Sequence, residues 1–220
     1  MRENLSAARA AELLMQKDNI TLLCHRRPDG DTVGSAFALY YALKELGKEV
    51  RVLCADALPK QYDYLYGDYT PSRVLDWPVE YVVTVDVATA GMLGGLEEKY
   101  GHMVDLCIDH HVSNSDYARL TLLDAQAAAA CEVMTSVIRH LGVPLTKPMA
   151  DALFTGHHRR TGIEDDVADG LGAGGGGVVG GDVDDVGVIG GSLGHGGDVV
   201  RIGEGIAGNG VALLGQAAFN

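Results

Sequence analysis

The sequence predicts an α/β fold, a doubly wound parallel sheet with flanking helices, followed by a glycine-rich tail. Short continuous apolar segments are typical of strands covered on both faces, and amphipathic segments between them indicate helices. Composition changes sharply near residue 162, because 20 of the 30 glycines lie in residues 162–220. We therefore expect a folded domain over residues 1–162 and a disordered Gly/Asp/Val-rich tail over residues 163–220.

Strands and helices are expected to alternate along the folded part. Apolar residues at helical spacing predict a helix over residues 3–17, and a strand follows from Ile20 to Cys24. Asp31 or Thr32 is expected to cap a second helix, which Gly47 ends. Further strands are expected at residues 50–54, 81–85 and 106–108, and further helices at residues 127–141 and after Pro148. Ligands of such sheets bind beyond the carboxyl ends of the strands.

Composition excludes several classes of protein. The 220 residues include 17 Lys plus Arg and 30 Asp plus Glu, a formal net charge of −13, which argues against general electrostatic binding of nucleic acid. No apolar run approaches the roughly 18 residues of a membrane span. The four cysteines lie far apart without a CxxC spacing, so we expect neither a zinc knuckle nor a disulfide framework, and a reducing cytoplasm is the expected location.

Metal-ligand residues follow three of the predicted strands. The first strand leads into Cys24-His25-Arg26-Arg27-Pro28-Asp29-Gly30-Asp31, the third into Asp86, and the fourth into Asp109-His110-His111. A single acid after a strand is usually a helix cap, but capping does not explain three such clusters at equivalent positions. Carboxylate oxygens together with imidazole nitrogens suit Mn²⁺, Fe²⁺ or Zn²⁺. Two such ions about 3.5–4 Å apart can polarise a phosphoryl group and generate a hydroxide nucleophile.

The motifs at these strand ends resemble those of the DHH phosphoesterase superfamily, within it the nanoRNase (oligoribonuclease) and 3′-phosphoadenosine 5′-phosphate phosphatase group. The matching residues are His25-x-x-Pro28-Asp29-Gly30-Asp31 with Gly34-Ser35, then Asp86, then Asp109-His110-His111. The resemblance runs from about residue 5 to residue 156. It implies a manganese-dependent phosphoesterase that hydrolyses short oligoribonucleotides or 3′-phosphoadenosine 5′-phosphate by a two-metal mechanism.

The resemblance also implies a role for each residue of the motifs. One Mn²⁺ would be bound by His25, Asp29 and Asp86, and the second by Asp31, Asp86 and His110. The substrate phosphate would face His111, while Asp109 would orient its neighbours.

Two arginines stand beside this predicted cluster. Arg26 and Arg27 are candidate contacts to phosphate oxygens of the substrate, and simple exposure to solvent is the alternative. The expected partner is a short oligonucleotide or phosphonucleotide, with neither duplex DNA nor a membrane.

The C-terminal part departs from the family pattern. The family's fourth motif, Thr-Gly-x-x-x-Asp-x-Gly, begins here at Thr155-Gly156, but Arg160 stands where the ligand Asp is expected. A guanidinium cannot be deprotonated in a protein and therefore cannot bind a metal cation. The family's substrate domain is not recognisable in residues 163–220, which carry a net charge of −8.

Two explanations of this departure are open: a divergent terminus, or a shift of the reading frame near Gly156. A one-base shift of the codons for His157-His158-Arg159-Arg160 can encode Ile-Thr-Asp-Gly, which restores the missing Asp. Of the 58 residues from Ile163 onward, 43 are of types that GNN codons encode. The alternative function is therefore an inactive relative without the fourth ligand motif and the substrate domain. A cyclic-dinucleotide phosphodiesterase or a pyrophosphatase with the same site is a further alternative.

Overall fold

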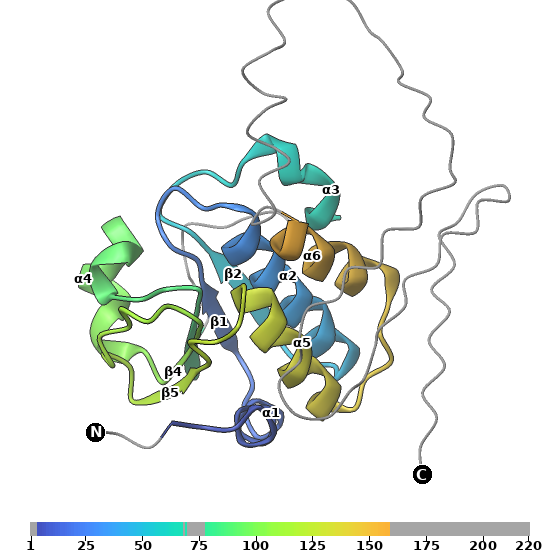
Figure 1. Cartoon of the computed structure of the whole chain (residues 1–220), viewed down its shortest axis with the longest axis horizontal. Coiled ribbons are helices and arrows are strands. Elements are labelled where there is room, and N and C mark those ends of the chain that lie inside the picture. Colours follow the sequence, from blue (N-terminus) through green and yellow to red (C-terminus); the bar gives the residue numbers. More distant parts are fainter. Residues whose placement is uncertain (1–3, 68, 70–77, 159–220) are drawn as a thin grey trace, which may run out of the picture. The chain divides into compact units, whose positions relative to one another are not determined.

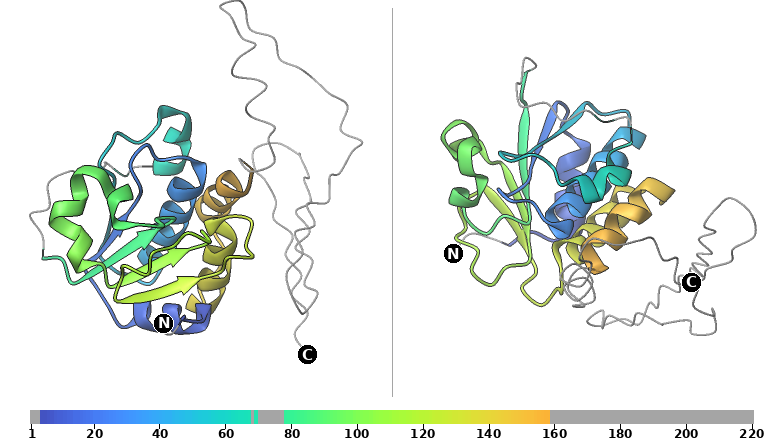
Figure 2. Two further views of the ribbon diagram at one scale, coloured as in Figure 1. Left: turned by 60° about the vertical axis from the view of Figure 1, so that its left-hand side comes forward. Right: turned by 90° about the horizontal axis from the view of Figure 1, so that it is seen from above.

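A five-stranded parallel sheet forms the centre of the fold in the computed structural model, which describes residues 4–67, 69 and 78–158 (Figures 1 and 2). The strands lie in the order β2-β1-β3-β4-β5, and every pair of neighbours is parallel. Their bounds are β1 (Ile20–Leu23), β2 (Val50–Leu53), β3 (Tyr81–Val85), β4 (Leu106–Asp109) and β5 (Leu120–Leu123). The predicted fold class is confirmed, whereas the predicted tail over residues 163–220 lies outside the described residues.

Helices cover both faces of the sheet (Figure 2). One face carries the long helices α1 (Ala7–Met15), α2 (Gly30–Glu45), α5 (Ala130–Leu141) and α6 (Lys147–His158). The other carries the 3₁₀ helix η2 (Ala90–Leu96), α4 (Glu97–Tyr100) and the 3₁₀ helix η3 (Gly101–Met103). The remaining short elements are the 3₁₀ helix η1 (Lys60–Tyr62) and α3 (Asp63–Tyr66), which packs against α2 and α6. No helix among the described residues combines the length and the apolar character needed to cross a membrane.

Each face of the sheet has its own hydrophobic core. Leu14, Phe37 and Val137 belong to the larger core beneath the long helices, and Leu93 and Tyr100 to the smaller core on the opposite face. Every residue of β1 and β3 is buried, which explains why these strands read as continuous apolar runs. All four cysteines are buried and none forms a disulfide among the described residues, which agrees with core packing.

Two sequence-based expectations about the elements are wrong. The Asp29 carboxylate caps α2 in place of Asp31 or Thr32, because its Oδ1 accepts hydrogen bonds from the amides of both residues at 3.1 and 3.2 Å. This arrangement leaves the carboxylate of Asp31 free to contact another helix. Strand β5 was not expected, although its sequence Leu-Thr-Leu-Leu closely matches the Ile-Thr-Leu-Leu of β1.

Helix α6 approaches α2 and α5 closely at two glycines. A Cβ on Gly34 would collide with the carbonyl oxygen of Ala152, and a Cβ on Gly156 would collide with the Sγ of Cys131. The same Cβ of Gly156 would lie 3.1 Å from Oδ1 of Asp31. Glycine at these positions therefore lets the end of α6 pack directly beside the first turn of α2.

Candidate metal centre

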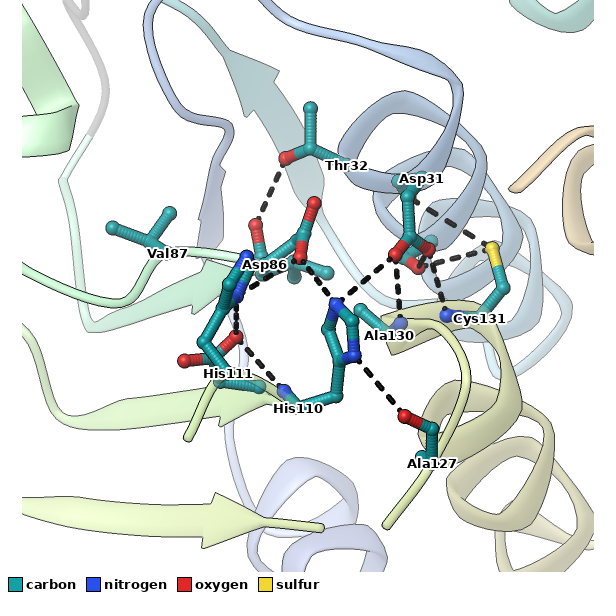
Figure 3. A network of polar contacts seen from close by, with 12 residues as sticks. Asp31, Thr32, Asp86, Val87, His110, His111, Ala127, Ala130 and Cys131 are labelled. Atoms are coloured by element: carbon teal, nitrogen blue, oxygen red, sulfur yellow. Dashed lines mark hydrogen bonds and ion pairs between the residues drawn. The ribbon is translucent and has the colours of Figure 1, made fainter. Parts of the chain in front are cut away.

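The predicted ligands meet at the carboxyl ends of β1, β3 and β4. In the strand order β2-β1-β3-β4-β5, β2 is added on one side of β1 and β3 to β5 are added on the other, and ligands of such sheets bind at this switch point between β1 and β3. His25 follows β1, and Asp86 follows β3. The Thr32 hydroxyl donates to the carbonyl oxygen of Val85 at 2.9 Å, which fixes the first turn of α2 against the end of β3 (Figure 3).

The first group of ligand atoms comes from His25, Asp29 and Asp86, and these atoms lie within 4.8 Å of one another. The Nε2 of His25 is 3.6 Å from a carboxylate oxygen of Asp29 and 3.6 Å from one of Asp86. Its Nδ1 lies 2.8 Å from the carbonyl oxygen of Arg26, which requires the proton on Nδ1. A neutral His25 therefore directs the Nε2 lone pair towards two carboxylates, an arrangement that needs a cation between them.

The second group contains Asp86, His110 and His111. The Nδ1 of His110 lies 3.2 Å from the carbonyl oxygen of Ala127, and its Nε2 lies 3.5 Å from Asp86 and 3.6 Å from Asp31 (Figure 3). The ring of His110 thus repeats the arrangement of His25. Both rings place Nε2 at distances longer than a hydrogen bond. Two ligands of one ion at metal distances of about 2.0–2.2 Å lie roughly 3.0–3.5 Å apart, so the separations fit a shared cation.

Asp86 lies between the two groups. It is 3% exposed, and one of its oxygens faces His25 while the other faces His110. Its φ is 60°, in the left-handed region that is strained for a residue other than glycine. Among the described residues, the buried Oδ1 of Asp86 has no hydrogen-bond partner. A buried carboxylate with an unsatisfied oxygen, between imidazole nitrogens, is a fitting bridge between two cations.

Protons compensate for the negative charge in the metal-free centre. Burial opposes protonation of His25, but the carboxylates of Asp29 and Asp86 outweigh it and raise the pKa of His25 from 6.5 to about 10. The nearby carboxylate of Asp86 also raises the pKa of His110. Burial and the nearby charge of Asp86 raise the pKa of Asp31 to about 6. The centre therefore has a strong affinity for positive charge.

Asp31 is held by the amino end of α5. Its Oδ2 accepts a hydrogen bond from the amide of Ala130 at 2.8 Å, and its Oδ1 accepts one from the amide of Cys131 at 2.9 Å (Figure 3). Asp31 thereby caps a helix that begins about a hundred residues later in the sequence. Its carboxylate is outside both groups of ligand atoms defined above, but it remains 3.6 Å from the Nε2 of His110.

Asp109 is fully buried behind His111 and accepts three hydrogen bonds. These come from the amide of His110 at 2.8 Å, the Nδ1 of His111 at 2.7 Å and the side-chain amide of Asn114 at 2.6 Å. Because Asp109 occupies the Nδ1 of His111, the Nε2 of that ring remains available. Asn114 was missed by sequence reasoning, although a polar residue so soon after a strand that ends in Asp-His-His is a usable signal.

The remaining predicted residues lie at the edge of the centre or beyond the described chain. Arg26 and Arg27 are exposed next to His25. Arg160, at the position of the missing ligand, is outside the described residues.

The chain is similar in sequence to known proteins. Residues 19–157 match the model of the DHH family, N-terminal domain. The chain is 32% identical over 142 residues to the bifunctional oligoribonuclease and PAP phosphatase NrnA of Thermus thermophilus, covering 62% of this chain and 41% of that protein. It is 23% identical over 148 residues to an uncharacterised protein of Methanocaldococcus jannaschii, covering 64% of this chain and 45% of that protein.

A solved structure shares the fold. The crystal structure of an exopolyphosphatase-related protein from Bacteroides fragilis superposes with a TM-score of 0.64 at 21% identity, covering 71% of this chain and 50% of that one. The chain spans less than half the length of the two curated relatives. Since the matched residues 19–157 contain both groups of ligand atoms and more than half of the sequence, the chain belongs to the DHH family.

Proposed function

We propose that this chain is a metal-dependent phosphoesterase that uses two divalent cations, Mn²⁺ in the first instance. The observation that carries the proposal is the position of Asp86, whose two oxygens face His25 on one side and His110 on the other. His25, Asp29 and Asp86 would hold one cation. Asp86, His110 and Asp31 would hold the other, because the Nδ1 of His111 is already engaged by Asp109.

The proposed chemistry is hydrolysis of a phosphate ester. When bound, a pair of divalent ions polarises a phosphoryl group and lowers the pKa of the attacking water. The buried Asp109 orients His111 through the Nδ1 of the ring, which leaves the Nε2 of His111 available to contact the substrate phosphate. Asn114 keeps Asp109 in place through its 2.6 Å hydrogen bond.

The proposed substrates are short oligoribonucleotides or 3′-phosphoadenosine 5′-phosphate. Support comes from the 32% identity with a relative named for those two activities. The net charge of −13 agrees with a small substrate that is held at a local site, because it disfavours extended nucleic acid.

One observation favours a second candidate, an impaired relative. The family match ends at residue 157, and Arg160 follows where the family pattern has an Asp ligand. A missing carboxylate would weaken the second cation site by more than the roughly 10–100-fold that is typical when a residue supporting a ligand is removed. The first cation site would remain, so Mn²⁺ binding would persist while turnover fell.

The experiment compares the full chain with Arg160→Asp. Mn²⁺ binding is measured by isothermal titration, and hydrolysis is measured on a diribonucleotide, 3′-phosphoadenosine 5′-phosphate, a cyclic dinucleotide and pyrophosphate. An active two-cation phosphoesterase binds two ions and hydrolyses the first two substrates in both chains. The impaired relative binds one ion tightly with little turnover, and Arg160→Asp then gains a second ion and at least about tenfold activity on those substrates. Arg9→Asp on α1 is the matched charge control.

Two results would contradict the proposal. Failure of both chains to bind Mn²⁺ would exclude the metal centre, and hydrolysis of pyrophosphate alone would exclude the assigned substrates. Two tightly bound ions with full turnover in the unmodified chain would instead show that the fourth-motif Asp is dispensable, and would reject the impaired relative.

A further inference from the structure

The chain makes an irregular turn at Asp86, the residue that faces both His25 and His110. Alternate residues of a strand point to the same face of a sheet, so Val83, Val85 and Val87 would share one core if β3 simply continued. Val83 and Val85 do belong to the larger core, but Val87 belongs to the smaller core on the opposite face. The left-handed φ of 60° at Asp86 accounts for this change of face.

The same turn sets the direction of the Asp86 carboxylate. The side chain of Val87 is 0% exposed and lies on the side of Asp86 away from His110 (Figure 3). The carboxylate oxygens face His25 at 3.6 Å and His110 at 3.5 Å. A left-handed conformation of a residue other than glycine persists only when its surroundings hold it. The contacts of the backbone beside Asp86 therefore decide where its carboxylate points.

Tyr117, in the loop between β4 and β5, contacts the chain on both sides of Asp86. Its hydroxyl lies 2.7 Å from the Oγ1 of Thr84 and 3.1 Å from the carbonyl oxygen of Val87, and it donates to both in a three-centre hydrogen bond. Thr84 and Val87 are both buried. The other donor to Val87 is the thiol of Cys107 at 3.5 Å, a weaker hydrogen bond. Loss of the phenol would therefore leave buried polar groups without their stronger partner.

The ring of Tyr117 contributes separately from its hydroxyl. The ring packs against the smaller core, to which Val87 itself belongs. Ser115 joins the same loop to the next residue of the turn, because its amide and its hydroxyl donate to the carbonyl oxygen of Ala88 at 2.9 and 3.3 Å. Removing only the hydroxyl of Tyr117 would keep these contacts and release the backbone next to Asp86.

We propose that Tyr117 is a positioning residue of the metal centre, whose hydroxyl holds the backbone on both sides of Asp86 so that the carboxylate lies between His25 and His110. The inference rests on the proposed function, because that function makes the Asp86 carboxylate the bridge between two cations. The hydroxyl bonds to Thr84 and to the backbone of Val87, so Tyr117 acts through Asp86 and not on the substrate.

The test compares Tyr117→Phe with the unmodified full chain by isothermal titration with Mn²⁺. Because both cation sites share Asp86, we expect the affinity to fall about tenfold at every site that the unmodified chain fills, the effect of one buried hydrogen bond. Tyr41→Phe is the matched control, since it removes a 2.7 Å phenol hydrogen bond to the carbonyl oxygen of Leu65, about 15 Å along α2 from Asp31. It should lower the unfolding temperature as Tyr117→Phe does, without changing Mn²⁺ affinity.

A double-variant cycle separates positioning from a general loss of stability. In an Asp86→Asn background the carboxylate that Tyr117 positions is gone, so adding Tyr117→Phe should change the remaining Mn²⁺ affinity by less than about twofold. The effect of Tyr117→Phe on the unfolding temperature should persist in that background, because the hydroxyl still bonds to Thr84 and Val87.

Hydrogen exchange tests the same contact in the metal-free chain. The amide of Asp86 donates to the carbonyl oxygen of Ile108 at 3.0 Å. In EDTA, nuclear magnetic resonance should show this amide exchanging about tenfold faster in Tyr117→Phe than in Tyr41→Phe, because the turn opens locally. The amide of Cys24, which bonds to β2 at 2.9 Å, should exchange at the same rate in the two variants.

Three results would overturn the inference: unchanged Mn²⁺ affinity in Tyr117→Phe, an equal loss in Tyr41→Phe, and a tenfold loss that persists in the Asp86→Asn background. If the unmodified chain fails to bind Mn²⁺, the proposed function is rejected, and the exchange rate of the Asp86 amide alone decides the role of Tyr117. An amide that exchanges no faster in Tyr117→Phe would then reject that role.

Discussion

The two halves of the metal centre are built from very different lengths of chain. The His25 half, comprising His25, Asp29 and Asp86, uses only the loops that follow the neighbouring strands β1 and β3. The Asp31 half, comprising Asp31, Asp86 and His110, also needs β4 and the first amides of α5. The close packing of Gly34 and Gly156 makes it depend on α6 as well.

This difference shows which half tolerates change elsewhere in the chain. The His25 half is complete within residues 25–86, so an altered C-terminal sequence leaves its ligands in place. The Asp31 half lies against α5 and against Gly156 of α6, which is four residues before Arg160 in the sequence. Four experiments can break or sharpen the comparison.

The largest effect is expected from Asp86→Asn, because Asp86 belongs to both halves. Asparagine tolerates the left-handed φ of 60° at this position, so the fold should remain. Loss of the bridging negative charge should weaken Mn²⁺ binding in both halves by more than about 100-fold. Titration calorimetry measures the Mn²⁺ affinity, and manganese paramagnetic resonance measures the number of ions bound.

Asp29→Asn supplies the contrast to Asp86→Asn. It should weaken only the His25 half, while asparagine preserves the cap of α2. The surface variant Asp151→Asn, whose carboxylate pairs with Lys147, is the control and should change neither site. If the Asp29→Asn and Asp86→Asn variants bind the same number of Mn²⁺ ions per chain, the division of the centre into halves is wrong.

A smaller effect is expected from Gly34→Ala, which tests the dependence on α6. The new methyl group would collide with the backbone at Ala152, so we expect a loss of about 1–3 kcal/mol of unfolding free energy despite the better helix propensity of alanine. Binding in the Asp31 half should weaken, and the His25 half should be unaffected. Urea unfolding and the Mn²⁺ titration together give both quantities.

Gly95→Ala is the matched control for this change. Gly95 has no neighbour within 4 Å and no positive φ, so alanine should be accepted without loss of stability. Equal unfolding free energies for the two alanine variants would show that the helix contact at Gly34 does not constrain the fold.

The smallest expected effect is a change in the Mn²⁺ affinity of the His25 half of about tenfold per pH unit. In the metal-free protein the pKa of His25 is raised from 6.5 to about 10, so its proton stabilises the folded state. That contribution is complete below pH 6.5 and is lost as the pH rises through about 10. Because a metal must replace this proton, Mn²⁺ affinity of the His25 half should rise about tenfold per unit between pH 6.5 and 8.

Calorimetry in buffers of different ionisation enthalpy measures the released proton. His25→Gln should abolish the release, whereas His140→Gln, on the exposed end of α5, should not change it. Mn²⁺ affinity that is independent of pH would mean that His25 carries no proton in the empty site.

Features that depend on local sequence patterns could be predicted from the sequence. Features that depend on contacts between residues far apart in the chain could not. The parallel sheet and the positions of His25, Asp86 and His110 follow from short apolar runs that end in polar residues. The role of Asp31 as a cap for α5 could not be predicted, because its partners lie 99 and 100 residues away.

Two further misses have the same cause. Asn114 differs from other loop residues only in that its side-chain amide donates to the buried carboxylate of Asp109. That contact is visible only in the folded structure. Strand β5 has nearly the same sequence as β1, and what makes it a strand is its pairing with β4 at the edge of the sheet, which the local pattern does not show.

The dependence of Asp31 on α5 also sets an order of assembly during protein synthesis. A ribosome delivers the chain from its N-terminus, so His25, Asp29 and Asp86 leave it together with β1, β2 and β3. The amides that hold Asp31 follow only with residues 130 and 131, and Gly156 comes later still. The nascent chain therefore has all three ligands of the His25 half before the residues that hold Asp31 in the other half have been synthesised.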